Sequence, residues 1–355
     1  MRPAAEDGVL SLDFLAGFTI FMLALIMVVS MVPGLLAGLE SSGIDYDAVA
    51  YRTGVILVED PGWPVYPPWE MNDEFHKDEI QRMGLAVSKE TPNVLLSTKV
   101  EKFFEQGFFT SEDYRNKAIF GDIPYSYNFS IRSEDGVYDL KTGDPLPPGY
   151  GYIRRVVKIK EPGVTEIVGN TVTPSSSPYW ISPPTSPTQT FAVRLNFSRL
   201  LDPERGPAYR IDPRIEPVHM TITNFGAYLN TTDPLVNSAT LQNVTFWKMD
   251  PTRPSPRFTR IPFSYGDENP NLYTLTLDGS SHDLTPSAPV SSSISLVLKP
   301  AATSQFTLDQ NSILEIRFAF EDDPPQTHIN GTHLYDYTNV TLPALSTGVL
   351  EVSIW

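Results

Sequence analysis

The chain has 355 residues, enough for two extramembrane domains of ordinary size. It contains no cysteine, which excludes disulfides, thiolate metal sites and a cysteine nucleophile. Its net charge of −16 argues against nucleic-acid binding, and its 33 prolines and 22 glycines favour a β-rich fold with many turns.

The first predicted element is an apolar segment, Phe14–Val32, in which Thr19 and Ser30 are the only polar side chains. About 20 such residues cross the ~30 Å hydrocarbon layer as a helix, so we expect a single membrane span. Arg2 precedes the segment and acidic residues follow it, which favours an extracytoplasmic location for the bulk of the chain. A secretory signal peptide is the alternative, although its apolar run is usually shorter and is followed by an Ala-x-Ala site.

The apolar periodicity continues past Pro33 and predicts one helix of about 50 residues, Val9–Val58, with a kink at Pro33. Its second half is amphipathic and therefore needs a packing partner. The Asp60-Pro61-Gly62 sequence marks its end. Residues 1–8 are a candidate signal prefix, and residues 9–60 are the predicted transmembrane and amphipathic helix.

Residues 61–125 are predicted to be a mixed helical and loop connecting region. Short helices are expected at 99–106 and 111–120, with Ser111 as the N-cap of the second. The region is rich in aromatic residues, which favour a hydrophobic core over a ligand cage: Trp63, Trp69, Phe103, Phe104, Phe108 and Phe109.

Residues 126–355 have the pattern of a β-rich extracytoplasmic region. Short alternating or β-branched runs are separated by turn residues, which is typical of a sandwich. The nine predicted strands lie at 125–131, 152–159, 190–197, 218–225, 243–249, 272–277, 293–298, 312–320 and 348–355. A Pro/Ser/Thr-rich loop at 171–190 interrupts them. The predicted fold class is α+β, a long N-terminal helix followed by a mainly β, sandwich-like domain.

Six Asn-x-Ser/Thr motifs predict N-glycosylation at solvent-facing positions of this region. They lie at Asn128, Asn196, Asn230, Asn243, Asn330 and Asn339. The alternative is that strand faces rich in Thr produce the motif incidentally.

The sequence carries no recognisable catalytic motif, so we expect neither an enzyme nor a cofactor. The densest group of possible metal ligands lies in residues 321–336 and comprises Asp322, Asp323, His328, His333 and Asp336. Their spacing matches no known metal site, and a surface loop is the preferred interpretation. Four basic residues occur in one predicted strand and complement acidic neighbours or another subunit: Arg154, Arg155, Lys158 and Lys160.

The N-terminal sequence G-VLSLD-FLAGF resembles the signal of type IV pilins, and more narrowly the archaeal class III signal. Ser11 and Asp13 match that signal and Val9 departs from it, while Glu6 and Asp7 replace the usual basic residues. Further segments within the first 130 residues also resemble archaeal pilin-like membrane proteins, including AYRTGVILVEDPGWP and RMGLAVSKETPNVLLSTKVEKFF.

The resemblance implies cleavage after Gly8 by a prepilin peptidase, which makes Val9 the new N-terminus. Asp13 would then be the fifth-position acid that meets the free amine of a neighbouring subunit. The alternative is an uncut anchor, with Asp13 at the lipid headgroup boundary near the helix N-terminus.

The expected function is structural: a pilin-like cell-surface protein that serves as a minor or tip filament subunit or as a displayed adhesin. Its expected partners are the membrane and either further copies or other pilin-like subunits. The alternative is an uncut, single-pass extracytoplasmic binding protein, and an anchored hydrolase is a third class that lacks a visible catalytic set.

Overall fold

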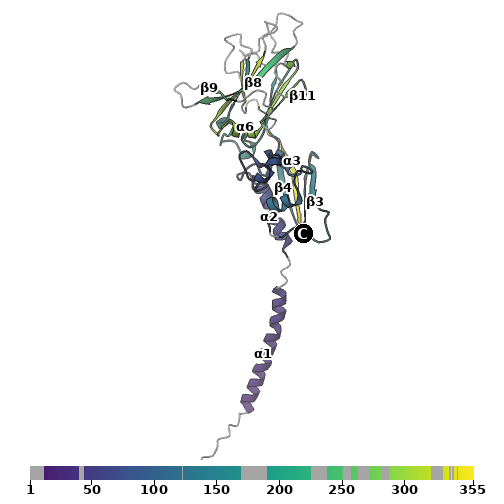
Figure 1. Cartoon of the computed structure of the whole chain (residues 1–355). Coiled ribbons are helices and arrows are strands. Elements are labelled where there is room, and N and C mark those ends of the chain that lie inside the picture. The colour runs from purple at the N-terminus through teal and green to yellow at the C-terminus, as the bar shows by residue number, and fades with distance from the viewer. Residues whose placement is uncertain are drawn as a thin grey trace, which may run out of the picture. The chain divides into compact units, whose positions relative to one another are not determined.

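The computed structural model describes residues 12–39, 44–121, 123–168, 190–224, 238–250, 257–262, 272–281, 288–320, 331–335, 337, 340–341 and 343–355 (Figure 1). The chain divides into two compact units, Met1–Tyr46 and Asp47–Trp355. Each unit is described separately below.

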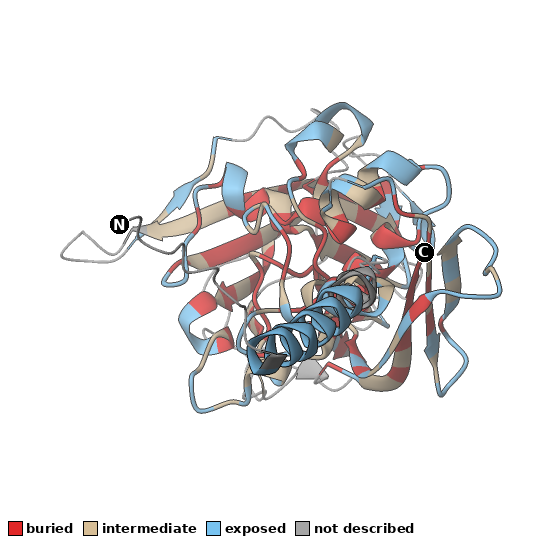
Figure 2. Cartoon of the chain, turned by 90° about the horizontal axis from the view of Figure 1, so that it is seen from below, coloured by how far each residue is buried: buried red, intermediate tan, exposed pale blue. Residues whose placement is uncertain are grey.

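The first unit contains helix α1, Leu12–Leu39, which continues through Pro33. The segment Asp13–Met31 is long and apolar enough to cross a membrane, by length and composition, and none of its residues is buried (Figure 2). The Thr19 and Ser30 hydroxyls donate to carbonyls of the preceding turn, so neither leaves an unpaired polar group on the helix.

The second helix, α2 (Tyr46–Glu59), is separate from α1, because Ile44 and Asp45 are not helical. The prediction of a single continuous helix from Val9 to Val58 is therefore wrong at residues 44 and 45. The helix end is as predicted: the Asp60 carboxylate accepts the Gly62 amide at 2.7 Å, and Gly62 has a φ of 83°.

Helix α2 packs on a five-stranded sheet. In spatial order its strands are β1 (Val94–Leu96), β4 (Gly151–Lys160), β17 (Leu345–Ile354), β2 (Tyr127–Ser133) and β3 (Asp139–Gly143). β1 pairs parallel with β4, and the other pairs are antiparallel. The C-terminal strand thus lies at the centre, and Trp355 exchanges two backbone hydrogen bonds with Ser126.

The contacts between α2 and β4 are close. A Cβ placed on Gly54 would lie 3.0 Å from Ile153 Cγ2 of β4, and the Asp47 carboxylate accepts the Tyr152 amide at 3.0 Å. The buried face of the helix is formed by Ala50, Thr53, Gly54, Leu57 and Val58. The packing partner that the amphipathic pattern required is therefore this sheet.

The aromatic residues of the connecting region form a core, as predicted, with one exception. Trp69, Phe103, Phe104, Phe108 and Phe109 are buried, whereas Trp63 is 48% exposed. The buried rings contact one another and Tyr114, and Phe103 also contacts Phe129 of β2. Rings from the connecting region thus pack against the sheet.

The short helices of this region differ in detail from the prediction. Helix α3 is Ser97–Phe103, and α4 (Ser111–Tyr114) continues into the π-helix η3, Arg115–Ile119. The N-cap of α4 is Thr110 and not Ser111, because Thr110 and Asp113 form a reciprocal capping box. Two 3₁₀ helices precede them, η1 (Trp69–Met71) and η2 (Glu74–Glu79).

The rest of the second unit contains two six-stranded sheets. The first has the order β11 (Ser280–Ser281), β10 (Tyr273–Leu277), β13 (Ile294–Leu298), β7 (Val218–Thr223), β5 (Val164–Val168), β16 (Val340–Thr341). The second has the order β12 (Ala288–Val290), β8 (Ala239–Asp250), β14 (Ile313–Phe320), β6 (Thr190–Asn196), β15 (Gly331–Tyr335), and β9 (Arg257–Arg260) pairs with β8. The described residues of this region also form three short helices: α5 (Phe197–Leu200), η5 (Pro207–Tyr209) and α6 (Pro300–Gln305).

One hydrophobic cluster takes side chains from both six-stranded sheets, including Val218 and Leu296 of the first and Phe246 and Phe318 of the second. All nine predicted strand segments coincide with strands of the structure. The α+β class, with an apolar N-terminal helix followed by a mainly β region, is confirmed. The predicted loop at 171–190 falls almost wholly outside the described residues.

Candidate functional site

The acidic residue predicted to direct assembly, Asp13, lies in the first turn of α1 and is exposed. The aromatic rings of Phe14 and Phe18 stack one turn apart beside it, with centroids 6.2 Å apart. The predicted processing residues Gly8 and Val9 lie outside the described residues. The described part of α1 therefore presents one carboxylate at the start of an otherwise apolar helix.

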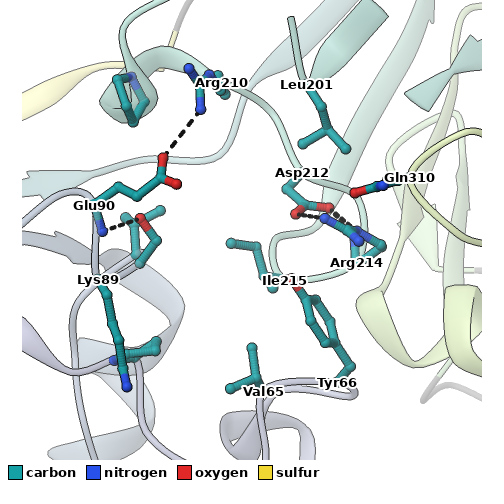
Figure 3. A pocket seen from close by; sticks show the side chains of 14 residues that line it. Val65, Tyr66, Lys89, Glu90, Leu201, Arg210, Asp212, Arg214, Ile215 and Gln310 are labelled. Carbon is teal, nitrogen blue, oxygen red and sulfur yellow. Dashed lines mark hydrogen bonds and ion pairs between the residues drawn. The ribbon is translucent and has the colours of Figure 1, made fainter. Parts of the chain in front are cut away.

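A cleft in the second unit is a site that the sequence did not indicate (Figure 3). Its volume is about 510 Å³. Val65, Val87 and Ile215 form its apolar part and belong to one small hydrophobic cluster. Its polar part comes from four segments that are separated in the sequence and includes Tyr66, Lys89, Glu90, Arg210, Asp212, Arg214 and Gln310.

Arg214 and Asp212 form the most tightly bonded pair in the cleft. The Arg214 guanidinium donates through Nε and Nη2 to the two Asp212 carboxylate oxygens, at 2.8 and 2.7 Å. The bond to Asp212 raises the pKa of Arg214, and burial raises the pKa of the Tyr66 hydroxyl. The guanidinium also lies 4.9 Å from the Tyr66 ring centroid, so the cation and the ring are held together.

Arg210 lies across the cleft from Arg214 and reaches Glu90 at 3.4 Å (Figure 3). Its Nε donates to the carbonyls of Asp202 and Arg205, which fixes the guanidinium in place. The cleft holds three cationic side chains and two carboxylates, so its formal charge is +1 in a chain of net charge −16. It is suited to a ligand that carries an apolar group beside negative charge.

A buried ion pair fixes the Arg210–Glu216 segment that forms one side of the cleft. Lys160 of β4 and Glu216 are fully buried, with Nζ and Oε1 2.7 Å apart. Lys160 Nζ also donates to the Arg210 carbonyl, and the Asp212 amide donates to the same Glu216 oxygen. Burial raises the pKa of Glu216, and the Lys160 charge opposes that rise. The pair thereby bonds β4 to the cleft residues.

The four basic residues of β4 divide between two environments. Lys160 pairs with Glu216, and Arg155 lies 3.8 Å from Glu59 of α2. Arg154 and Lys158 are exposed. Acidic neighbours within the chain therefore account for two of the four.

Three of the six predicted glycosylation sites fall on described residues, and all three are partly exposed. Asn128 lies in β2 and donates to the Asp144 carbonyl at 2.8 Å. Asn196 caps helix α5, and Asn243 lies in β8. The others, Asn230, Asn330 and Asn339, lie outside the described residues.

Of the possible metal ligands in residues 321–336, only His333 lies among the described residues. His333 is 1% exposed within β15, and Asp322, Asp323, His328 and Asp336 lie outside the described residues. No group of three acidic or histidine side chains among the described residues is arranged to hold a metal ion.

Comparisons with known proteins give one informative match. A protein of Archaeoglobus fulgidus described as uncharacterized is 42% identical over 146 residues, which are 39% of this chain and 76% of that protein. No family model matches the chain, and no solved structure matches it.

Proposed function

The chain belongs to the same protein family as the uncharacterized Archaeoglobus fulgidus protein, and we propose that it is a type IV pilin-like surface protein. In this proposal α1 is the assembly and membrane helix, and residues 47–355 are displayed outside the cytoplasm. The protein acts as a minor or tip subunit of a filament, or as a displayed adhesin.

The observation that carries the proposal is the exposed apolar surface of α1 between Asp13 and Met31. Every residue from Asp13 to Met31 is exposed, and apart from Asp13 the segment holds only apolar, small or hydroxyl side chains. An apolar surface of this length is stable in lipid or against other apolar helices, and not in water. The folded region begins with helix α2, which packs on the five-stranded sheet.

Asp13 gives the helix a means of pairing with a neighbour. An unpaired carboxylate in an apolar environment costs several kcal/mol, so it favours a partner of positive charge. Cleavage after Gly8 creates a cationic amine at Val9, about one helical turn before Asp13 in the chain. The Val9 amine of one subunit can therefore pair with Asp13 of the next.

The exterior region fits a display role. We infer that the two six-stranded sheets pack as a sandwich, because one hydrophobic cluster takes side chains from both. The partly exposed Asn128, Asn196 and Asn243 are positions where glycans would increase bulk and protease resistance. At 39.5 kDa the chain is large for a bulk filament subunit, which favours a minor or tip role.

Two measurements test the proposal. Mass spectrometry of the native protein should find Val9 at the N-terminus, and a chain that starts at Met1 or Arg2 would refute processing. Replacing Asp13 by Ala should abolish incorporation into filaments while the protein stays in the membrane. The matched control is Ser30→Ala, which removes a hydroxyl already bonded within the same helix, and which should assemble normally.

The cleft favours a second candidate, an uncut single-pass binding protein. In that case α1 is only an anchor, and the cleft holds a ligand of the extracytoplasmic space. An intact N-terminus together with normal behaviour of the Asp13→Ala variant would support this candidate over the pilin-like one.

A further inference from the structure

The most exposed large apolar side chain among the described residues is Phe75, at 93%. It lies in the 3₁₀ helix η2 beside three exposed carboxylates, Glu74, Asp78 and Glu79. We call Glu74–Glu79 the acidic knob. A fully exposed phenylalanine forgoes about 1.5–3 kcal/mol of burial, which a partner that covers the ring would recover.

The acidic knob is held rigidly. The Asp73 carboxylate caps its start by accepting the Phe75 and His76 amides, both at 3.0 Å. Lys77 turns inward, where its ammonium donates to the Phe108 carbonyl at 2.6 Å and lies 2.8 Å from Asp113. The backbone is thus fixed from both sides, and Phe75 loses little conformational freedom when it binds.

The cleft described above has the properties that such a knob needs. Val65, Val87 and Ile215 form an apolar surface for a phenyl ring. The three cationic side chains around it exceed the two carboxylates by one, because Glu90 and Asp212 pair with Arg210 and Arg214. A volume of about 510 Å³ accommodates an aromatic side chain together with flanking groups. Like net charges of −16 repel two copies of the chain, so any contact between copies requires local opposite charges.

We propose that the acidic knob of one copy docks into the cleft of a second copy, with Phe75 as its apolar anchor. The knob and the cleft are different surfaces, so the contact is heterologous and each copy can bind two others. The proposal deepens the proposed function, on which it rests, because it identifies the partner of the exterior region as another copy of this chain.

The absence of cysteine allows a direct test by disulfide formation in the full-length chain in its membrane. Asp78→Cys is introduced into copies with one affinity tag and Gln310→Cys, at an uncharged position that lines the cleft, into copies with another, and the two are coexpressed and oxidised. Both positions are exposed, so neither substitution should disturb folding. We expect a disulfide-linked dimer that carries both tags. The control pairs Asp78→Cys with Lys141→Cys, an exposed position on β3. This control should give little of the mixed dimer.

A second variant separates docking from chance collision. Adding Phe75→Ala to the Asp78→Cys copies should lower the yield of mixed dimer at least about tenfold, as expected for a central aromatic anchor. A mixed dimer no more abundant than in the Lys141 control, or unaffected by Phe75→Ala, would overturn the proposal. Dimers linking only Asp78→Cys copies would show a symmetric contact instead and would also overturn it.

The outcomes distinguish this inference from the proposed function. A Val9 N-terminus and filaments without mixed dimers would refute only the docking of knob and cleft. Mixed dimers formed by a chain that retains Met1 would refute only the pilin-like processing.

Discussion

The Glu70 carboxyl is buried in η1, and neither of its oxygens has a hydrogen-bond partner among the described residues. Burial raises its pKa from 4.5 to about 7, although the charge of the buried Lys99 opposes this rise. Lys99 itself is held by hydrogen bonds to the carbonyls of Pro61 and Ala86. The two groups therefore share a buried site where α2 ends.

The raised pKa of Glu70 makes stability depend on pH. The folded state holds the proton more tightly than the unfolded state, so this contribution is fully present below pH 4.5 and is lost as the pH rises to about 7. The loss amounts to about 3 kcal/mol, at 1.36 kcal/mol per pKa unit. Glu70→Gln should remove it.

The measurement is the free energy of unfolding of both proteins between pH 4.5 and pH 8. The Gln variant should be the more stable at pH 8 and should show a flatter profile between pH 4.5 and pH 7. Parallel pH profiles of the two proteins would contradict the assignment.

At the scale of elements, the junction between α2 and the rest of its unit depends on Gly84. A Cβ at this position would overlap the Asp60 carbonyl and lie 2.5 Å from the Gly62 amide nitrogen, both of them backbone atoms that cannot rotate away. The adjacent Leu85 amide donates to the Leu57 carbonyl at the end of α2, and the Gly84 carbonyl accepts the Trp69 indole N–H at 2.9 Å. The chain segments are therefore packed backbone to backbone here.

Gly84→Ala should destabilise the protein by about 3 kcal/mol or more, because backbone would have to move. The matched control is Gly149→Ala, where a Cβ meets nothing within 4 Å, and the expected change is within about 1 kcal/mol. Chemical denaturation of the two variants measures the difference. Equal free energies of unfolding for the Gly84→Ala and Gly149→Ala variants would contradict this prediction.

At the scale of the whole molecule, the two units differ in what they require from their surroundings. None of the residues Asp13–Met31 of α1 is buried, whereas α2 buries one face on the sheet. A chain that starts at Ile44 should therefore be folded and soluble in water. A chain that starts at Pro61 should aggregate, because it exposes the sheet face that α2 covers, at about 1.5–3 kcal/mol for each large apolar side chain.

Size-exclusion chromatography and tryptophan fluorescence distinguish the two truncated chains. A monomeric, cooperatively unfolding product is expected only from the longer one. Aggregation of both chains would show that residues before Ile44 contribute to the fold.

Much of the secondary structure followed from local pattern, and the misses have identifiable causes. Most of the nine predicted strands alternate between buried and more accessible positions, which is readable along a single segment. β3 was missed because it is a polar edge strand with no buried residue, and β15 because its sequence resembles a surface loop. The break between α1 and α2 was missed because apolar spacing continues across it, although Ser41-Ser42-Gly43 are poor helix formers.

The candidate site was less predictable than the fold. Asp13 and the Asn-x-Ser/Thr motifs could be named from the sequence because each is a short continuous pattern. The cleft could not, because Tyr66, Glu90 and Arg214 come from separate segments whose approach depends on the topology. The exposure of Phe75 was equally hidden, since a phenylalanine among charged residues is usually turned inward.

By itself the sequence determined that one apolar helix precedes a β-rich region, because hydrophobicity and its period are properties of neighbouring residues. The tertiary structure alone decided which charges pair and which surfaces face solvent. The fully buried contact between Lys160 and Glu216 joins residues 56 positions apart, and no local pattern encodes it. Such contacts arise only when the strand order of three sheets has been set.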